Sequence, residues 1–282
     1  MNRRQSLGGG ARGFIPLKGR NVGVETPTYR RITSEVGWAF SPTKSKIAFT
    51  LAEVLITLGI IGIVAALTLP TLIQNHANKV VETRLMKFYS AINQAITLAE
   101  VDYGDREFWY AKYDDLEKDA QGRPVTGKSD REKWFNKYLA PYMKITETKY
   151  NSEGYPIFYL ADGGCFAFIN STSLYDWRFY TKDYFKCKKG EERYSEVNTG
   201  VCDFTFNYAP DAYKKYASFA NVSRNFEPFK YSWDGTLEGF KNGIQYSDGY
   251  RACNERNKAF CAAYIQYNGW KIPDDYPVKV SY

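Results

Sequence analysis

The sequence has a single histidine, His76, which removes most of the ways in which a protein activates a serine or cysteine nucleophile. Such a nucleophile needs an imidazole beside it, and His76 lies in a segment that we assign below to a helix outside the rest of the domain. Other candidate catalytic groups are carboxylates in turn-like stretches, where solvated acids are usual, namely Asp234, Asp248, Asp274 and Asp275. We therefore expect no enzymatic activity and no cofactor.

The five cysteines include no CxxC pair, and with one histidine the chain lacks the usual ligands of zinc. We expect no metal site. The odd count leaves one thiol over if two bridges form, and the sequence alone does not choose among the pairings. Local closure favours Cys253–Cys261, with Cys187–Cys202 as a plausible second bridge and Cys165, in an apolar stretch, as the buried thiol.

Residues 49–282 carry no net charge. The first 48 residues hold nine lysines and arginines against Glu25 and Glu35, a net charge of +7 that equals the charge of the whole chain. The alkaline pI of about 8.9 therefore comes from this short segment. Because nucleic-acid binding depends on a basic surface, the composition gives no support for a nucleic-acid partner.

Only one long apolar run is present, from Phe49 to Ile73. As a helix these 25 residues would reach about 37 Å, enough to cross a hydrocarbon layer of about 30 Å. Basic residues such as Lys44 and Lys46 precede it, so the positive-inside rule places the N-terminus in the cytoplasm and the remainder on the other side. A secretory signal peptide is the alternative, but it would have a shorter apolar region and no acid like Glu53 at its start.

The string AFTLAEVLITLGIIGIVAALTLP, Ala48 to Pro70, resembles the N-terminal cleavage and methylation segment of type IV prepilins and type II secretion pseudopilins. The match comprises a basic leader, the small Ala48, Phe49 as first mature residue, Glu53 as the fifth and Pro70 as the twenty-second. The resemblance implies that a prepilin peptidase cuts between Ala48 and Phe49 and N-methylates Phe49. The family usually has glycine before the cut, and since Ala48 is also small we expect unchanged or slower cleavage.

The resemblance covers roughly Lys44 to Glu100 and implies how the chain is divided. Residues 1–48 are expected to be a disordered leader that is removed, 49–73 a transmembrane and assembly helix, and 74–102 the soluble half of that helix. A leader of 48 residues is long. A start codon downstream of Met1, which would shorten the leader, is therefore the alternative to a start at Met1. Apolar residues at three- and four-residue steps predict one buried helical face: Ile73, Ala77, Val80, Val81, Leu85, Phe88, Ile92, Ala95, Ile96 and Ala99. Pro70 should kink or locally melt the helix.

Residues 103–154 are charged and are predicted to be the variable connection between helix and sheet. They include Gly122–Ser129, which fits the phosphate-loop pattern GxxxxGK[ST]. A phosphate loop needs a buried strand before it, and the charged residues 114–120 cannot form one. Ser129 and Glu132 instead form a capping-box pattern that opens a short helix. The apolar face of this helix would consist of Trp134, Phe135, Tyr138 and Leu139, and we expect no nucleotide binding.

Residues 155–282 are predicted to be an antiparallel β-sheet region with loops. The predicted strands are Tyr155–Leu160, Cys165–Ile169, one that contains Phe204, Phe206 and Tyr208, and Cys261–Tyr267 with its continuation at Trp270 and Ile272. Asp162-Gly163-Gly164 and Asn268-Gly269 would be the hairpin turns. A long helix followed by strands predicts an α+β fold in which an antiparallel sheet packs on the helix, as in pilins. The many aromatic residues are expected in this core, with a sugar- or partner-binding surface as the alternative.

The resemblance further implies a structural subunit of a type IV pilus-like or type II secretion pseudopilus filament. Its partners would be prepilin peptidase, other pilin or pseudopilin subunits and the bacterial inner membrane, which it would cross once with its C-terminal domain periplasmic or extracellular. A surface pilus, a secretion pseudopilus and a DNA-uptake filament fit equally. A single-span membrane-anchored binding protein that does not polymerise is the alternative from another class.

Glu53 is the acid on which the assembly hypothesis depends. The run from Phe49 to Ile73 holds no basic residue, and a carboxylate alone in hydrocarbon is costly. We expect Glu53 to pair with the methylated amine of Phe49, in a neighbouring subunit or in its own, and so to set the register between adjacent helices.

Overall fold

The computed structural model describes residues 49–109, 116–123, 125–168, 176–188, 198–208, 210, 225–246 and 249–282. The predicted leader, Ala48 and Asp248 lie outside these residues. The helices are α1 (Leu51–Tyr103), η1 (Arg106–Phe108), α2 (Asp130–Tyr138), η2 (Ala140–Tyr142), α3 (Tyr184–Lys188), α5 (Leu237–Asn242) and α6 (Cys261–Tyr267). The strands are β1 (Ile145–Tyr150), β2 (Pro156–Leu160), β3 (Cys165–Phe168), β4 (Asp176–Tyr180), β5 (Asp203–Asn207), β6 (Glu227–Pro228), β7 (Ile244–Tyr246) and β8 (Gly249–Arg251). The fold is α+β, as predicted.

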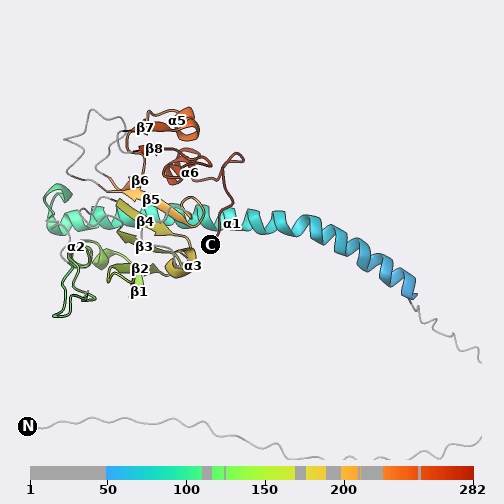
Figure 1. Ribbon diagram of the computed structural model, residues 1–282, viewed down its shortest axis with the longest axis horizontal. Coiled ribbons are helices and arrows are strands. Elements are labelled where there is room, and N and C mark those ends of the chain that lie inside the picture. The colour runs from blue at the N-terminus through green and yellow to red at the C-terminus, as the bar shows by residue number, and fades with distance from the viewer. Residues whose placement is uncertain are drawn as a thin grey trace, which may run out of the picture. The chain divides into compact units, whose positions relative to one another are not determined.

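Helix α1 is one continuous element of 53 residues, of which only the second half packs against the sheet. It passes through Pro70 without a break, so the predicted local melting is absent (Figure 1), and this part of the helix shows only a gentle curve. The predicted apolar stripe is buried from Ala77 to Ala99. Ile73 is exposed and Val80 is half-buried, so burial begins one helical turn later than the sequence pattern indicates.

Phe88 is the centre of the contact between α1 and the sheet. Its ring stacks on Phe179 with centroids 4.4 Å apart and lies 5.2–5.4 Å from the rings of three further phenylalanines, Phe166, Phe206 and Phe226. Offset and edge-to-face aromatic pairs of this kind add stability beyond their buried area. A cluster of five phenylalanine rings thus fixes α1 on the sheet.

The sheet is six-stranded and antiparallel, with strands in the order β1-β2-β3-β4-β5-β6. The β2–β3 hairpin forms at the predicted turn, where Gly163 has a φ of +84° and the Leu160 amide donates to the Gly164 carbonyl at 2.9 Å. Only glycine adopts such a φ without strain, which is why the turn sequence was informative. Strand β1 lies within residues 103–154, which were assigned to the connection, because Ile145 is the only apolar residue in its first half.

Both faces of the central strands are buried. One face meets α1, and the other holds a second apolar cluster with Tyr159, Cys165 and the Cys187–Cys202 disulfide. Beside this cluster Asp203 is fully buried and accepts from Arg178 Nη1 at 2.6 Å and Lys188 Nζ at 3.3 Å. The buried carboxylate of Asp203 therefore has two cationic hydrogen-bond donors in place of water.

Residues 229–276 form a further cluster around Trp233, Phe240 and Tyr264, closed by the Cys253–Cys261 disulfide. Here one sequence prediction is wrong, because Cys261–Tyr267 is helix α6 and not a strand. Its residues Cys261 to Ile265 are all buried, so there was no period to separate a short apolar helix from a short buried strand. Asn268-Gly269 ends this helix, and no strand follows at Trp270 and Ile272, both of which are described.

Candidate functional site

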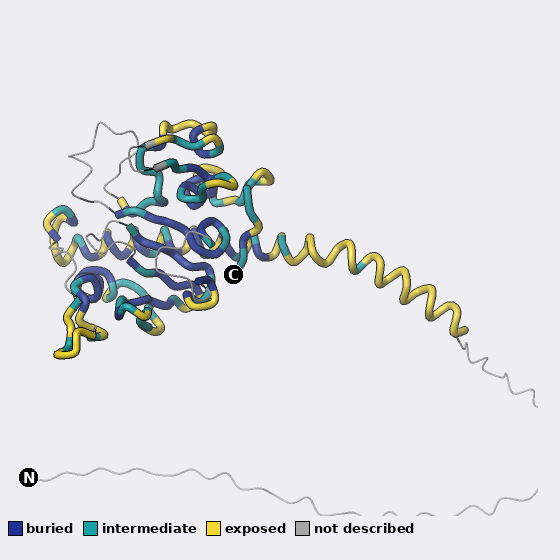
Figure 2. The backbone as a smooth tube through the Cα atoms, viewed as in Figure 1, coloured by how far each residue is buried: buried dark blue, intermediate teal, exposed yellow. Residues whose placement is uncertain are grey.

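The first half of α1 is an exposed apolar surface. Nearly every side chain from Leu51 to Ile73 is exposed (Figure 2), and so is Phe49, which precedes the helix at 78% exposure. Glu53 lies in the first turn and is the only acid there, and Pro70 is exposed near the other end. Within the described residues, this helix is long and apolar enough to cross a membrane.

Leaving this surface in water would be costly. It presents large aliphatic side chains at Leu51, Val54, Leu55, Ile56, Leu58, Ile60, Ile61, Ile63, Val64, Leu67, Leu69, Leu72 and Ile73. At about 1.5 kcal/mol or more for each buried side chain, covering them is worth on the order of 20 kcal/mol. An apolar surface of this size marks a membrane or protein contact.

The point at which α1 meets the domain is held by polar contacts. Glu82 is buried and accepts from Lys271 Nζ at 2.9 Å and from the Ile272 amide at 2.9 Å. Arg84 donates to the backbone carbonyls of Thr181 and Asp162. These contacts join α1 to the C-terminal segment on one side and to the β2–β3 and β4 ends on the other.

The last residues of the described chain lie against the same part of α1 (Figure 1). Gln74 Nε2 donates to the Val280 carbonyl at 3.4 Å, and the rings of His76 and Tyr282 meet edge to face at 5.6 Å. Ser281 is bonded to the sheet end through its amide and through its carbonyl, which accepts from Thr181 Oγ1 at 2.7 Å. The helix is therefore fixed by several contacts where it enters the domain and is not joined to it by a flexible linker.

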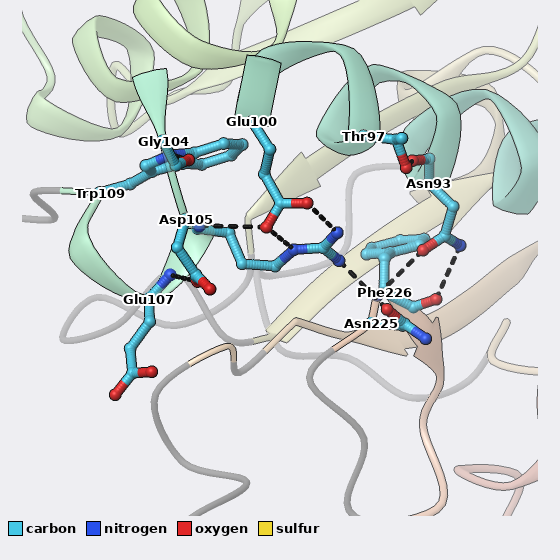
Figure 3. Close-up of polar contacts among 10 residues, drawn as sticks. Asn93, Thr97, Glu100, Gly104, Asp105, Glu107, Trp109, Asn225 and Phe226 are labelled. Carbon is cyan, nitrogen blue, oxygen red and sulfur yellow. Dashed lines mark hydrogen bonds and ion pairs between the residues drawn. The ribbon is translucent and has the colours of Figure 1, made fainter. Parts of the chain in front are cut away.

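Polar side chains also fix the other end of α1 (Figure 3). Arg106, which is buried, donates to both carboxylate oxygens of Glu100 at 2.7 and 2.6 Å and to Asn225 Oδ1 at 3.1 Å. Asn93 makes a pair of hydrogen bonds with the backbone of Phe226, at 2.9 and 3.2 Å. Bidentate arginine–carboxylate pairs fix orientation as well as distance, so the end of the helix is rigidly placed.

Asp102, one residue before the end of α1, accepts a hydrogen bond from Tyr142 of η2. This bond to the carboxylate raises the pKa of Tyr142 to about 12. The hydrogen bond thus ties the end of α1 to η2.

The segment that matches the phosphate-loop pattern ends in the N-cap of a helix. Ser129 Oγ accepts from the Glu132 amide at 3.3 Å and caps α2, as the capping-box pattern predicts. The Glu132 carboxylate accepts from Tyr150 of β1 at 2.8 Å. Lys128 is exposed, and among residues 116–123 no strand leads into the loop.

The predicted cysteine pairs are the two disulfides described above, and Cys165 is a buried free thiol. Its burial raises the pKa of the Cys165 thiol far above the usual range, so it is a poor nucleophile. Of the turn acids, Asp234 accepts from the Thr236 amide and Asp275 from Tyr264. The described residues contain no group of three or more metal-ligating side chains.

Sequence reasoning did not find the polar contacts that hold α1. Glu82, Asn93 and Glu100 are polar residues beside the apolar stripe, and that position was the available signal. Their partners, such as Arg106 and Asn225, are distant in sequence or follow a loop, so no local pattern could identify them.

No curated protein and no solved structure matched the chain. The model of a family of unknown function, DUF6613, matches residues 71–280, about three quarters of the chain. The match begins directly after Pro70 and covers the second half of α1, the sheet and the C-terminal cluster. The chain therefore belongs to this family, DUF6613.

Proposed function

We propose that this protein is a structural subunit of a type IV pilus-like or type II secretion pseudopilus filament. It is inserted in the inner membrane as a prepilin, cut between Ala48 and Phe49 and N-methylated by a prepilin peptidase. The single observation that carries the proposal is the first half of α1, an exposed apolar helix with one acid, Glu53, at the fifth position after a prepilin-like cut.

The two halves of α1 support different steps of this function. The exposed half from Leu51 to Ile73 would lie in lipid before assembly and against neighbouring helices afterwards. The half from Ala77 to Ala99 packs against the sheet of the same chain. A helix that is rigidly attached to its domain transfers its position in a helical bundle to the domain, which a flexible anchor would not do.

In this proposal Glu53 sets the offset between adjacent helices. The amine of Phe49 that cleavage creates stays charged after methylation, and its attraction to a carboxylate in hydrocarbon is strong. Contacts among leucine, isoleucine and valine tolerate a slip along the helix, whereas a charge pair does not. The pairing thus selects one register, and it requires no enzymatic chemistry and no cofactor.

The first test is the intact mass of the protein extracted from membranes of cells with an active prepilin peptidase. We expect a chain that begins at Phe49 and carries one added methyl group. A protein that keeps Lys44 to Ala48 would overturn the proposal and favour a membrane-anchored binding protein, because an anchor does not need its leader removed.

The second test is Glu53→Val, with Thr57→Val as the matched control that removes another polar group from the same exposed stretch. Glu53→Val should insert and be cut normally but fail to enter sheared filaments, and Glu53→Asp should retain part of the incorporation. The Thr57→Val protein should assemble like the wild type. Normal incorporation of Glu53→Val would refute the register role.

A further inference from the structure

A groove of about 240 Å³ runs beside the buried half of α1, between this helix and the β1–β2 edge of the sheet. Its apolar lining includes Phe88, Met143 and Leu160, and Lys87 and Lys144 stand at its rim. Both lysines are exposed, and neither makes an ion pair within the part of the chain that is described. The remaining charged residue of the lining, Asp162, has Oδ1 occupied by the Gly164 amide at 3.0 Å.

The end of α1 and the turn after it, residues Glu100–Trp109, which we call the apex, have the opposite character. Four acids and one arginine give the apex a net charge of −3. Val101 and Phe108 are each 81% exposed, the most exposed of the large apolar side chains described. An exposed valine and phenylalanine among acids have the composition that an apolar groove with a basic rim would accept.

The apex is also preorganised. Arg106 holds Glu100 in a bidentate pair, and Trp109 Nε1 donates to the Gly104 carbonyl at 2.9 Å (Figure 3). Little conformational freedom would therefore be lost when Phe108 enters a partner surface, which favours binding.

We propose that the apex of one copy docks in the groove of a second copy, with Phe108 on the apolar floor and the acids facing Lys87 and Lys144. A copy does not seat Phe108 in its own groove, because this side chain is 81% exposed. The contact joins two different surfaces, so it is heterologous and each copy keeps one apex and one groove open. Such contacts form rings or open helical chains.

This inference deepens the proposed function. It rests on that function for the stage at which the contact between apex and groove forms. Parallel copies whose apolar runs span one membrane stand at the same depth. The apex of one copy is then level with the apex of its neighbour and not with the neighbour's groove, so the two surfaces do not meet. The contact becomes available when one copy has moved along the helix direction relative to its neighbour, by about 9 Å if the distance is taken from Gln94 of the groove to Glu100 of the apex. It would thus form on entry into the filament and not among subunits waiting in the membrane.

The test is disulfide cross-linking between two variants of the full chain that each add one exposed cysteine and keep Phe108 and both lysines, Val101→Cys at the apex and Gln94→Cys in the groove. They are mixed in detergent micelles in which depth is no longer fixed. We expect a cross-linked dimer from the mixture and little from either variant alone. A mixture of Val101→Cys with Glu255→Cys, an exposed residue outside the groove, is the matched control. Equal yields from the control and the test mixture, or no dimer from the test mixture, would overturn the docking.

The same pair is then coexpressed in cells and compared between membranes and sheared filaments. We expect the cross-link in filaments and its near absence in membranes. Filaments that contain the protein without the cross-link would remove this inference and leave the proposed function standing. The cross-link in detergent with no filament under any condition would support the docking and count against the proposed function.

Charge reversal gives an independent measurement. In a background that also carries Gln94→Cys, Lys87→Glu should lower the yield of the detergent cross-link by roughly tenfold or more, because it places an acid opposite the acidic apex. Lys79→Glu, an exposed lysine on α1 outside the groove, should leave the yield unchanged. An unchanged yield for Lys87→Glu would contradict charge complementarity as the basis of the contact.

Discussion

Buried charge in this protein is concentrated at Asp203, whose carboxylate is shared by Arg178 and Lys188 behind the sheet. A buried ion pair adds little net stability compared with an apolar pair, but removing one partner leaves a charge without its compensation. The cluster therefore matters as a unit, and it lies next to the Cys187–Cys202 bridge that fixes the segment carrying Lys188.

We expect Arg178→Met to lower the free energy of unfolding by about 3 kcal/mol, because Asp203 would keep only the lysine at 3.3 Å. Urea unfolding followed by tryptophan fluorescence measures this change, since Trp177 is fully buried next to the site. The control is Lys133→Met, which removes an exposed pair with Asp130 and should cost about 1 kcal/mol or less. Equal losses for the two variants would contradict a special role for the buried cluster.

Substitutions at Ser129 and Lys128 distinguish between two roles of this segment, a helix cap and a nucleotide site. If the segment is only a cap, Ser129→Ala should destabilise the protein by about 1 kcal/mol, because the Glu132 amide loses its acceptor. Lys128→Ala should change nothing, since the side chain is exposed. Calorimetry with millimolar ATP and magnesium should show no binding, and saturable binding abolished by Lys128→Ala would contradict this.

At the scale of elements, the entry of α1 into the domain depends on Glu82. Its carboxylate accepts from the Ile272 amide, which has no other acceptor among the described residues, and from Lys271, whose side chain is 69% exposed. Glu82→Ala should therefore lower the free energy of unfolding by about 1–3 kcal/mol, and Lys271→Ala by less than about 1 kcal/mol.

Hydrogen exchange is the second measurement for this pair. The Ile272 amide should exchange faster in Glu82→Ala and at the wild-type rate in Lys271→Ala. A larger loss for Lys271→Ala would show that the ion pair, and not the backbone bond, holds the C-terminal segment.

Elements with a strong local signal were predictable from the sequence. The period of the stripe gave α1, the cap at Ser129 gave α2, and the glycines at 163 and 164 gave the β2–β3 hairpin. Helix α6 was mistaken for a strand because burial on all sides removes the period. Strand β1 was missed because an edge strand with exposed threonine and glutamate has little apolar alternation.

The candidate site was predictable only where it is local. Glu53 and Pro70 are positions in one apolar run, and the sequence locates that run, whereas its exposure is a finding of the structure. The contacts of Arg84 and Asn93 depend on which backbone groups the fold leaves open beside the helix, and the contact of Arg106 depends on a side chain distant in sequence, Asn225. Such groups arise only once the sheet and α1 have packed, so no spacing in the sequence records them.

At the scale of the whole molecule, the exposed half of α1 decides where the protein resides. We expect the full chain to sediment with membranes and to remain there in alkaline carbonate, because about 20 kcal/mol of apolar burial is lost on release. A chain that lacks residues 49–73 should be released, with unchanged disulfides as its folding control. Extraction of the full chain by carbonate would contradict a membrane-spanning helix.

The continuity of α1 has a mechanical consequence. The stripe from Ala77 to Ala99 runs along the helix, so tension applied along the axis loads the aromatic contacts of Phe88, the Glu82 bonds and the Arg106 pair together, in shear. A sideways force would instead open them one at a time, as in peeling. A chain pulled through the exposed half of α1 is thus loaded in the direction in which its domain resists rupture best.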